Sequence, residues 1–146
     1  MKMQSKPGFT LMEVLMVVVL LGIFALIAVP RFANVKKLSY TTARELVGDL
    51  RNTRSLAINT GVSHYLKLLP SGGPYTEYKI FDKDDNQIGD TQIIPDGVTC
   101  TATTDTFSFN YLGSCNNGSD DSITLVGESE TYTVYITGIT GRAYIQ

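Results

Sequence analysis

The sequence predicts an α+β protein in which one long amino-terminal helix packs on an antiparallel β-sheet. Three observations lead to this prediction. Residues 9–29 form an almost unbroken apolar run. Apolar residues at helical spacing then continue to about residue 60. Beyond Gly61 the spacing changes to a period of two, in short segments separated by Gly, Asp and Asn turns.

Length and charge limit the classes of protein to consider. A chain of 146 residues allows one ordinary domain plus an appendage. The formal net charge is −2 and the isoelectric point is acidic, so the composition lacks the basic excess typical of nucleic-acid binding. After the first thirty residues the chain is polar and rich in Thr and Gly, as expected of a globular domain.

The apolar run has the length of a membrane span. A helix from Phe9 to Val29 would be about 31 Å long, close to the roughly 30 Å of a bilayer's hydrocarbon core. The run is longer than the apolar region of a secretory signal, and no small-residue cleavage motif follows it. We therefore expect residues 9–30 to be a retained helix. Lysines and arginines flank it on both sides, so charge does not orient it.

Glu13 is the one carboxylate in this run. A charged side chain at the centre of a bilayer costs roughly 2.5–3.5 kcal/mol on insertion scales. Glu13 therefore either extends toward the headgroups or has a partner that neutralises its charge.

The helix is expected to continue as an amphipathic segment over residues 31–61. Pro30 predicts a kink there, with Gly22 as a second weak point, and the alternative is a helix that ends at Val29. Continuation is favoured by a stripe of apolar residues, and Gly61 is a natural stop. The stripe consists of Val35, Leu38, Leu46, Leu50, Ala57 and Ile58.

Residues 62–146 are expected to form the β-rich globular domain. Six segments are short, rich in β-branched and aromatic residues, and bounded by turn residues. They are 62–69, 75–81, 87–94, 106–112, 122–126 and 131–137. A helix followed by successive hairpins predicts antiparallel sheet packed on that helix.

Two cysteines, Cys100 and Cys115, lie in this domain. An even, small count behind a membrane-targeting segment favours one disulfide in an oxidising compartment. Closing a loop of about 15 residues would contribute roughly 3 kcal/mol in the chain-entropy model. The alternative is two buried thiols, and the polar sequence around Cys115 argues against it. An oxidised pair also places the carboxyl-terminal domain outside the cytoplasm.

Catalytic and metal-binding patterns are weak. His64 is the single histidine, which excludes His-based metal clusters and Ser-His-Asp arrangements, and it is expected on a strand. The sequence therefore predicts no catalytic residue, no metal site and no cofactor. Residues 82–90 begin like a calcium loop, but Gln87 and Ile93 stand where an EF-hand needs Gly and Glu, so a polar hairpin turn is favoured. The acidic stretch 116–121 also offers oxygen ligands and leaves calcium as an alternative.

The amino terminus resembles the type IV prepilin signature, in the stretch KPGFTLMEVLMVVVLLGIFALIAVP. The resemblance implies that residues 1–8 are a leader, cleaved between Gly8 and Phe9 by a prepilin peptidase, and that the new Phe9 amine is N-methylated. It also implies that Glu13 meets the Phe9 amine of a neighbouring subunit during assembly, since pairing removes an uncompensated charge from hydrocarbon.

The rest of the chain resembles the GspH/FimT group of minor pilins and pseudopilins. The stretches LVGDLRNTRSLAINTGVSHYLKL, FSFNYLGSC, SITLV and VYITGITGRAYIQ carry this similarity. It implies a type IV pilin-like fold and a structural subunit that is no enzyme. Such a subunit crosses the inner membrane once, with a periplasmic domain, and then enters a pilus or a type II secretion pseudopilus beside other pilin subunits.

Two other functions remain open at this point. A major pilin differs from a minor one in abundance, and the sequence does not separate pilus from secretion machinery. A DNA-capturing pilin needs clustered Lys or Arg. The carboxyl-terminal tail supplies Arg142 alone, and the sheet region has Lys67, Lys79 and Lys83, which argues against nucleic acid as a partner.

Overall fold

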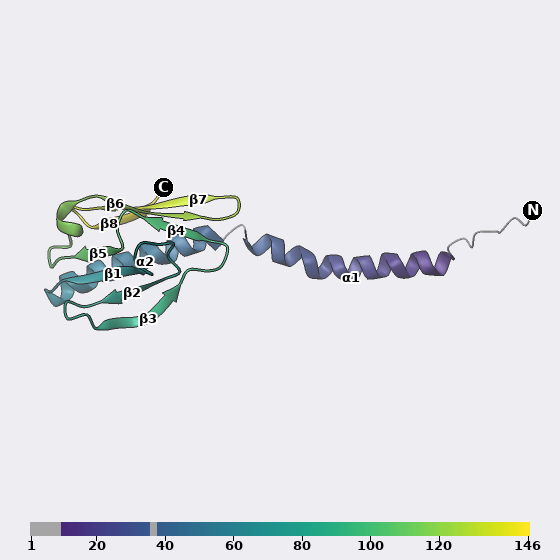
Figure 1. Cartoon of the computed structure of the whole chain (residues 1–146), viewed down its shortest axis with the longest axis horizontal. Helices are drawn as coiled ribbons and strands as arrows, with labels where there is room; N and C mark the ends of the chain where they lie inside the picture. The colour runs from purple at the N-terminus through teal and green to yellow at the C-terminus, as the bar shows by residue number, and fades with distance from the viewer. Residues whose placement is uncertain (1–9, 36–37) are drawn as a thin grey trace, which may run out of the picture. The chain divides into compact units, whose positions relative to one another are not determined.

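The fold was analysed in a computed structural model that describes the backbone of residues 10–35 and 38–146, and the side chains of residues 10–24 and 38–146. By its internal contacts the chain divides into two compact units, one ending at Asn34 and one from Val35 to Gln146. The first contains helix α1 (Leu11–Val35) except its last residue, and the second contains helix α2 (Leu38–Thr60) and the described strands (Figure 1).

Helix α1 continues through Gly22 and Pro30 as far as Val35. The alternative of a helix that ends at Val29 is therefore wrong. A proline removes only its own backbone donor, so the bonds of the residues around it can hold the helix together. The expected continuation past residue 31 is present on both sides of residues 36–37, which lie outside the described residues.

Helix α2 is amphipathic, as predicted. Its buried residues recur every three or four positions, and two of them, Thr42 and Thr53, donate their hydroxyls to the carbonyl oxygens of Leu38 and Asp49 at 2.9 and 2.7 Å. Both buried hydroxyls therefore have a hydrogen-bond partner. The helix ends at Thr60, and Gly61 follows with φ +71°, which confirms the predicted stop.

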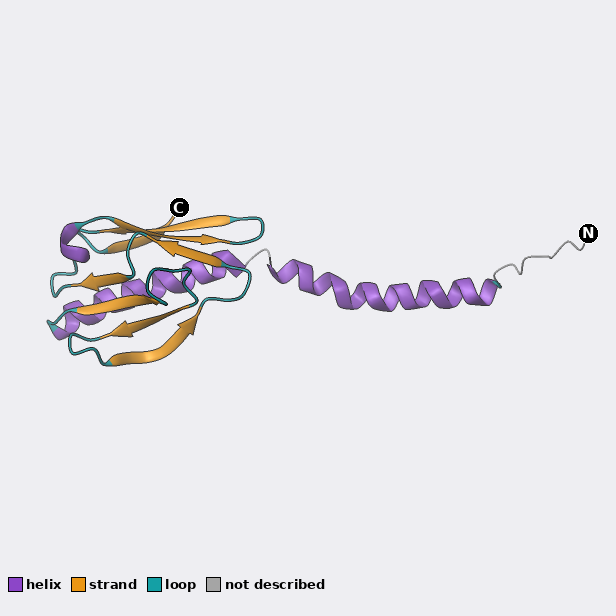
Figure 2. Cartoon of the chain, viewed as in Figure 1, coloured by secondary structure: helices purple, strands orange, loops and turns teal. Residues whose placement is uncertain are grey.

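The strands form two four-stranded antiparallel sheets (Figure 2). Sheet A has the order β3-β2-β1-β5, and sheet B has the order β4-β6-β7-β8. In sheet A the strands are β1 (His64–Leu69), β2 (Glu77–Phe81), β3 (Gln87–Ile93) and β5 (Thr106–Phe109). In sheet B they are β4 (Thr99–Ala102), β6 (Asp121–Val126), β7 (Thr131–Thr137) and β8 (Arg142–Ile145).

The α+β architecture and all six predicted strands are confirmed, with small shifts at their ends. Two features differ from the prediction. There are two sheets, and strand β4 was missed, because its sequence TCTA contains no aromatic or large aliphatic residue to mark an alternating pattern. Strand β8 was indicated only through the similarity of its segment to the GspH/FimT group.

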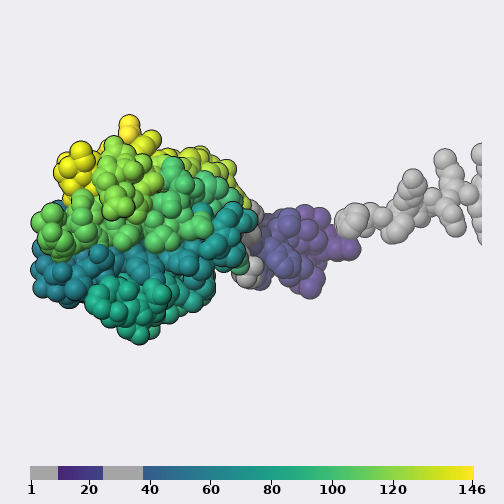
Figure 3. Space-filling view, turned by 60° about the vertical axis from the view of Figure 1, so that its left-hand side comes forward, coloured from purple at the N-terminus to yellow at the C-terminus, as the bar shows by residue number. Residues whose placement is uncertain are grey.

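The core lies between α2 and the two sheets. Helix α2 contacts strands of both sheets, and Figure 3 shows the green and yellow carboxyl-terminal segments adjoining the blue and teal segments that precede them. Burying each large apolar side chain contributes about 1.5–3 kcal/mol, so this shared core holds the second unit together. The largest fully buried apolar side chains are Leu46, Leu50, Leu66, Leu68, Phe107, Phe109, Ile123, Leu125, Val134 and Ile136.

Candidate assembly site

Thr10 caps the amino terminus of α1. Its hydroxyl oxygen accepts a hydrogen bond from the backbone N–H of Glu13 at 3.3 Å, and its carbonyl accepts from Glu13 and Val14 at 3.0 and 3.2 Å. Thr10 and Glu13 therefore occupy the first and last positions of a capping-box sequence. The exposed carboxylate of Glu13 lies in the first turn, where the helix dipole favours a negative charge.

The apolar side chains of α1 are exposed. Over Leu11–Phe24, where the side chains of this helix are described, the large hydrophobic residues are between 46% and 85% exposed. Soluble monomers rarely expose a continuous apolar surface of this length. Helix α1 is therefore a surface that another molecule must cover.

One side of α1 forms a shallow apolar groove. Its lining residues follow the spacing i, i+3, i+4, i+7 and i+8, which places them on one helix face. They are Leu11, Val14, Leu15, Val18 and Val19. Such a stripe is suited to packing against a second apolar helix.

Of the processing residues, Gly8 and Phe9 lie outside the described residues. Within residues 10–35 and 38–146, no helix meets the combined length and hydropathy requirement for a membrane span.

The predicted disulfide is not formed. Cys100 and Cys115 are free, and both are fully buried. Cys100 in β4 pairs with Leu125, near the carboxyl end of β6. Cys115 donates its backbone N–H to the carbonyl oxygen of Gly138, which follows β7 and lies beyond Asp121, at the opposite end of β6. Four residues of strand span about 13 Å, well beyond the roughly 7 Å that a disulfide allows between Cα atoms. Burial raises the pKa of each thiol to about 12, which makes both unreactive.

The polar surroundings of Cys115 misled the prediction because those side chains bind the backbone of neighbouring segments. Asn116 accepts the N–H of Ser108 at 2.9 Å through Oδ1, and Asp120 accepts the N–H of Gly138 at 2.7 Å. The loop can therefore turn its polar groups aside and place the thiol in the core.

The two acidic loops are occupied by internal hydrogen bonds. The carboxylate of Asp82 accepts the N–H groups of Asp84 and Asn86 at 2.8 and 2.9 Å, which confirms the predicted hairpin turn between β2 and β3. No group of three or more His, Cys, Asp and Glu side chains is placed to hold a metal ion in the part of the chain that the structure describes. His64 begins β1, as expected, and its side chain is buried.

A second surface gathers four arginines from α2 and β8, and we call it the arginine face. Arg51 and Arg54 line a cleft of about 690 Å³ with Arg142, and Arg44 and Arg51 line a neighbouring cleft of about 550 Å³ with Tyr40 and Tyr144. The guanidinium of Arg44 lies over the Tyr40 ring at 5.8 Å, and that of Arg142 over the Tyr144 ring at 5.7 Å.

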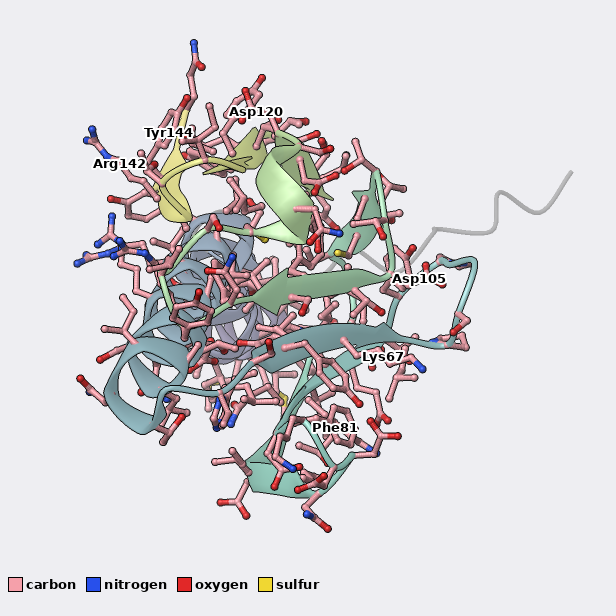
Figure 4. The ribbon with its side chains drawn as sticks, turned by 90° about the vertical axis from the view of Figure 1, so that its left-hand side faces the viewer. Lys67, Phe81, Asp105, Asp120, Arg142 and Tyr144 are labelled. Carbon is pink, nitrogen blue, oxygen red and sulfur yellow. The ribbon has the colours of Figure 1, made fainter. Side chains whose placement is uncertain are left out.

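Two of these guanidiniums are fixed by backbone carbonyls. Arg51 donates to the carbonyl oxygen of Ala143 from Nε and Nη2 at 3.1 and 2.8 Å, and Arg54 donates from Nε to Gly113 at 3.0 Å. Each guanidinium carries five N–H donors, so these bonds leave further donors on both arginines. Figure 4 shows Arg142 and Tyr144 on the opposite side of the domain from Lys67 and Phe81.

The arginine face was not predicted from the sequence, because Arg142 was considered only as a single cation of the tail. The signal was present in the spacing of Arg44, Arg51 and Arg54, since intervals of seven and three residues lie on neighbouring parts of one helix face. That β8 would lie beside this helix face could not be predicted from spacing. The structure also separates Lys67 from Arg142 and so divides the basic residues considered for DNA binding.

The exposed helix and the α+β unit define a protein with the fold of type IV pilins and pseudopilins. Residues 3–29 match the family model of the prokaryotic N-terminal methylation motif. The crystal structure of the type IV minor pilin FimU of Pseudomonas aeruginosa is similar, with a TM-score of 0.59 and 15% identity over 73% of this chain and 91% of that one. The minor pseudopilin EpsH of the Vibrio cholerae Type 2 Secretion System has a TM-score of 0.59 and 9% identity over 75% and 96%.

At these identities the likeness is one of fold. It agrees with the resemblance to the GspH/FimT group, since one neighbour is a minor pilin and the other a minor pseudopilin. The amino-terminal motif is of the type IV prepilin kind.

Proposed function

We propose that this chain is a minor structural subunit of a type IV pilus or of a type II secretion pseudopilus. In this proposal it waits in the inner membrane as a single-pass protein with its carboxyl-terminal domain in the periplasm. It then enters a fibre by packing α1 against the corresponding helices of other subunits.

The observation that supports this proposal most strongly is the uncovered apolar surface of α1. Each large apolar side chain that leaves water contributes about 1.5–3 kcal/mol, and residues Leu11–Phe24 expose a continuous series of them. A bilayer covers this surface before assembly, and neighbouring helices cover it in the fibre. The second unit has its own core, since the buried hydrophobic residues of the described chain all belong to it.

Maturation gives Glu13 its partner. A prepilin peptidase cuts between Gly8 and Phe9, and the new amine of Phe9 is methylated and positively charged. Thr10 remains to cap the helix after this cut, so the Glu13 carboxylate stays in the first turn. In an apolar surrounding an unpaired carboxylate is costly, so pairing with the Phe9 amine of a neighbouring subunit fixes the stagger between two helices.

The experiment compares Glu13→Ala with Glu128→Ala in cells that assemble the fibre. Glu128 is an exposed carboxylate of the globular domain and serves as the matched control. Both variants should be cleaved and inserted, but only Glu13→Ala should be strongly depleted from sheared fibres, as measured by immunoblot against the membrane pool. Equal incorporation of the two variants would remove the assembly role of Glu13.

Deleting the gene distinguishes the two machines. Loss of surface fibres with normal protein export indicates a pilus subunit, and loss of export with normal fibres indicates a pseudopilus subunit. The ratio of this chain to the other subunits in sheared fibres, measured by mass spectrometry, distinguishes a minor from a major pilin. A minor subunit should be present at a small fraction of the most abundant pilin.

A further inference from the structure

We propose that the arginine face binds a short, extended acidic segment of a different subunit of the same fibre. This inference rests on the proposed function and deepens it, because it assigns a surface and a chemistry to one contact with a neighbouring subunit. In that function copies of this chain are sparse in the fibre. Its neighbours are therefore other chains, and the partner is not a second copy.

The two clefts of the arginine face adjoin along α2 and β8. Arg51 lines both of them, with Arg44 on one side and Arg54 on the other. Arg44 and Arg54 are ten residues apart on α2, which is about 15 Å along the helix. An extended chain covers that distance with about four or five residues, at roughly 3.3 Å each. The clefts together can therefore receive a short stretch of another chain.

The clefts are lined by cations and by no acid. None of the residues that line either cleft is Asp or Glu. Over residues 10–24 and 38–146, the salt bridges join lysines to carboxylates within residues 77–84, and no arginine takes part. The acidic residues of α2 lie on the side of sheet A: Asp49 accepts the hydroxyl of Tyr78 at 2.7 Å, and Glu45 is one turn before Asp49. Four guanidiniums therefore gather without a counter-charge from the described part of their own chain.

These guanidiniums are held in place before any partner binds. Arg51 and Arg54 donate hydrogen bonds to backbone carbonyls, and Arg44 and Arg142 lie over tyrosine rings. Side chains that are already restricted lose less conformational entropy when a ligand binds. The arrangement therefore favours binding of carboxylates, which accept the paired donors of a guanidinium.

The edge of β8 beside the clefts supplies backbone groups for an extended segment. Strand β8 pairs with β7 alone, and Thr133 and Gln146 exchange both backbone bonds, so the polar groups of Ala143 and Ile145 face away from β7. Arg51 takes the carbonyl of Ala143, and none of the described contacts involves the backbone of Ile145, which lines the cleft. A segment in extended conformation can bind such an edge through its own backbone.

Gly48 lines the cleft between Arg44 and Arg51. It lies inside α2, where alanine is the more stable residue. A Cβ at this position would meet no atom within 4 Å, so packing within the described chain does not require glycine here. The space that Gly48 leaves open lets a partner's backbone approach the helix closely between two cations.

The charge of the domain favours a short acidic segment over nucleic acid. Residues 38–146 contain seven Lys and Arg against thirteen Asp and Glu, a formal net charge of −6. A long phosphate backbone would be repelled by this excess beyond the arginine face, whereas a few carboxylates contact the face locally. Arg and Tyr are also the residues that carry most binding energy at protein interfaces.

The first test measures binding of a fluorescent eight-residue peptide of alternating Glu and Thr to the full-length chain in lipid nanodiscs, by fluorescence anisotropy. Alternation places every carboxylate on one side of an extended strand. The peptide should bind more weakly as salt is raised, and Arg44→Glu/Arg142→Glu should weaken binding tenfold or more. A matched peptide with Gln in place of Glu should also bind at least tenfold more weakly. Equal binding of the acidic peptide by the unaltered chain and the double variant overturns the proposal.

Matched variants separate charge, shape and folding. Lys67→Glu/Lys83→Glu changes the net charge by the same amount away from the face and should bind the peptide within about twofold of the unaltered chain. Gly48→Gln fills the cleft without changing charge and should weaken binding, whereas Gly48→Ala should have little effect. Urea unfolding of each variant shows that the globular domain is folded.

The second test identifies the partner in the native host. Tyr144 is replaced by the photo-crosslinking residue p-benzoylphenylalanine, and Phe81, on the opposite side of the domain, is replaced in the same way as a control. The crosslink from position 144 should join a different fibre subunit, at a segment with two or more Asp or Glu. Reversal of those carboxylates to Lys should return Arg44→Glu/Arg142→Glu, otherwise depleted, to sheared fibres. A crosslink to a second copy, or to a segment without carboxylates, overturns the proposal.

The same nanodiscs are titrated with a 30-base-pair DNA duplex. Duplex binding that is tighter than peptide binding and is abolished by Arg44→Glu/Arg142→Glu would assign the face to nucleic acid and overturn the proposal. If this double variant enters fibres as the unaltered chain does while Glu13→Ala does not, the subunit function stands and this inference falls. Absence of the unaltered chain from fibres would instead overturn the proposed function.

Discussion

Arg51 of α2 donates two hydrogen bonds to the carbonyl oxygen of Ala143 in β8, a residue 92 positions further along the chain. Strand β8 is an outer edge, because it pairs with β7 alone. Thr133 and Gln146 exchange both backbone bonds, so in this antiparallel ladder the polar groups of Ala143 face away from β7. The guanidinium therefore both attaches the last strand to α2 and covers an open sheet edge.

Replacing Arg51 should loosen the carboxyl-terminal strand. Arg51→Lys loses the forked geometry and Arg51→Met also loses the charge, and hydrogen bonds to a charged donor are worth about 1.5–3 kcal/mol. We expect unfolding free energies lower by up to that amount, measured by urea unfolding followed through tyrosine fluorescence. Asn52→Ala, an exposed neighbour on α2, should be close to neutral. If Arg51→Met and Asn52→Ala unfold alike, the bond to Ala143 contributes nothing.

Alkaline pH should destabilise the domain through its tyrosines. Tyr78 donates its hydroxyl to Asp49 at 2.7 Å, and burial together with this bond raises the pKa of Tyr78 well above its usual value. Burial and the bond to Asp85 raise the pKa of Tyr65 to about 12, and the bond to Asp105 with burial raises that of Tyr75 to about 12. Each of these hydroxyls is therefore stabilised in its protonated form by the fold.

The sign follows from proton binding. Unfolded tyrosine loses its proton near pH 10 while the folded residues keep theirs, so the folded state binds more protons above pH 10 and stability falls as pH rises. The unfolding free energy should change little between about pH 7 and pH 9 and should decrease between pH 10 and 12. Tyr78→Phe should make this decrease shallower, whereas Tyr111→Phe, at a 59% exposed residue, should not. Identical slopes for the two variants would contradict the role of Tyr78.

The two cysteines should behave as buried thiols. With both pKa values raised to about 12, neither should react with iodoacetamide in the native protein at pH 8. Both should be alkylated in denaturant without a reductant, giving two adducts by intact mass. Alkylation that requires a reductant would show a disulfide and would mean that β4 and the Cys115 loop lie much closer than their strand pairing allows.

The same mass spectrum tests maturation. Protein taken from the native host should lack Met1–Gly8 and carry one added methyl group, located on Phe9 by fragmentation. Protein produced without a prepilin peptidase should keep the leader. A mature protein that begins beyond Pro30 would exclude α1 from any fibre.

The regular elements could be predicted from sequence because each depends on local spacing. The stripe through Leu46 and Leu50 predicted the buried face of α2, and Gly61 predicted where the helix ends. The alternation of apolar and polar residues predicted the strands. Contacts between distant segments carry no such local signal. Strand β4 depends on its pairing with β6, and the separation of Cys100 from Cys115 depends on which ends of β6 they lie near. The arginine face likewise exists only because β8 lies beside α2.

Glycine positions separate local from tertiary constraints in the same way. Gly141 has φ +62°, and a Cβ there would lie 2.0 Å from the carbonyl oxygen of Gly113, the group that accepts the hydrogen bond of Arg54. An alanine here would clash with the backbone of Gly113 and would also be strained at this positive φ. Gly141→Ala should therefore destabilise the domain by at least about 2 kcal/mol.

Gly48→Ala is the matched control for this substitution, because it adds the same methyl group to α2 in open space. It should stabilise the domain by about 0.5–1 kcal/mol, since alanine is the better helix former. Urea unfolding of both variants therefore predicts shifts of opposite sign. A tolerated Gly141→Ala would mean that the β7–β8 turn can move away from α2, and the position of Arg142 beside Arg54 would then no longer be fixed.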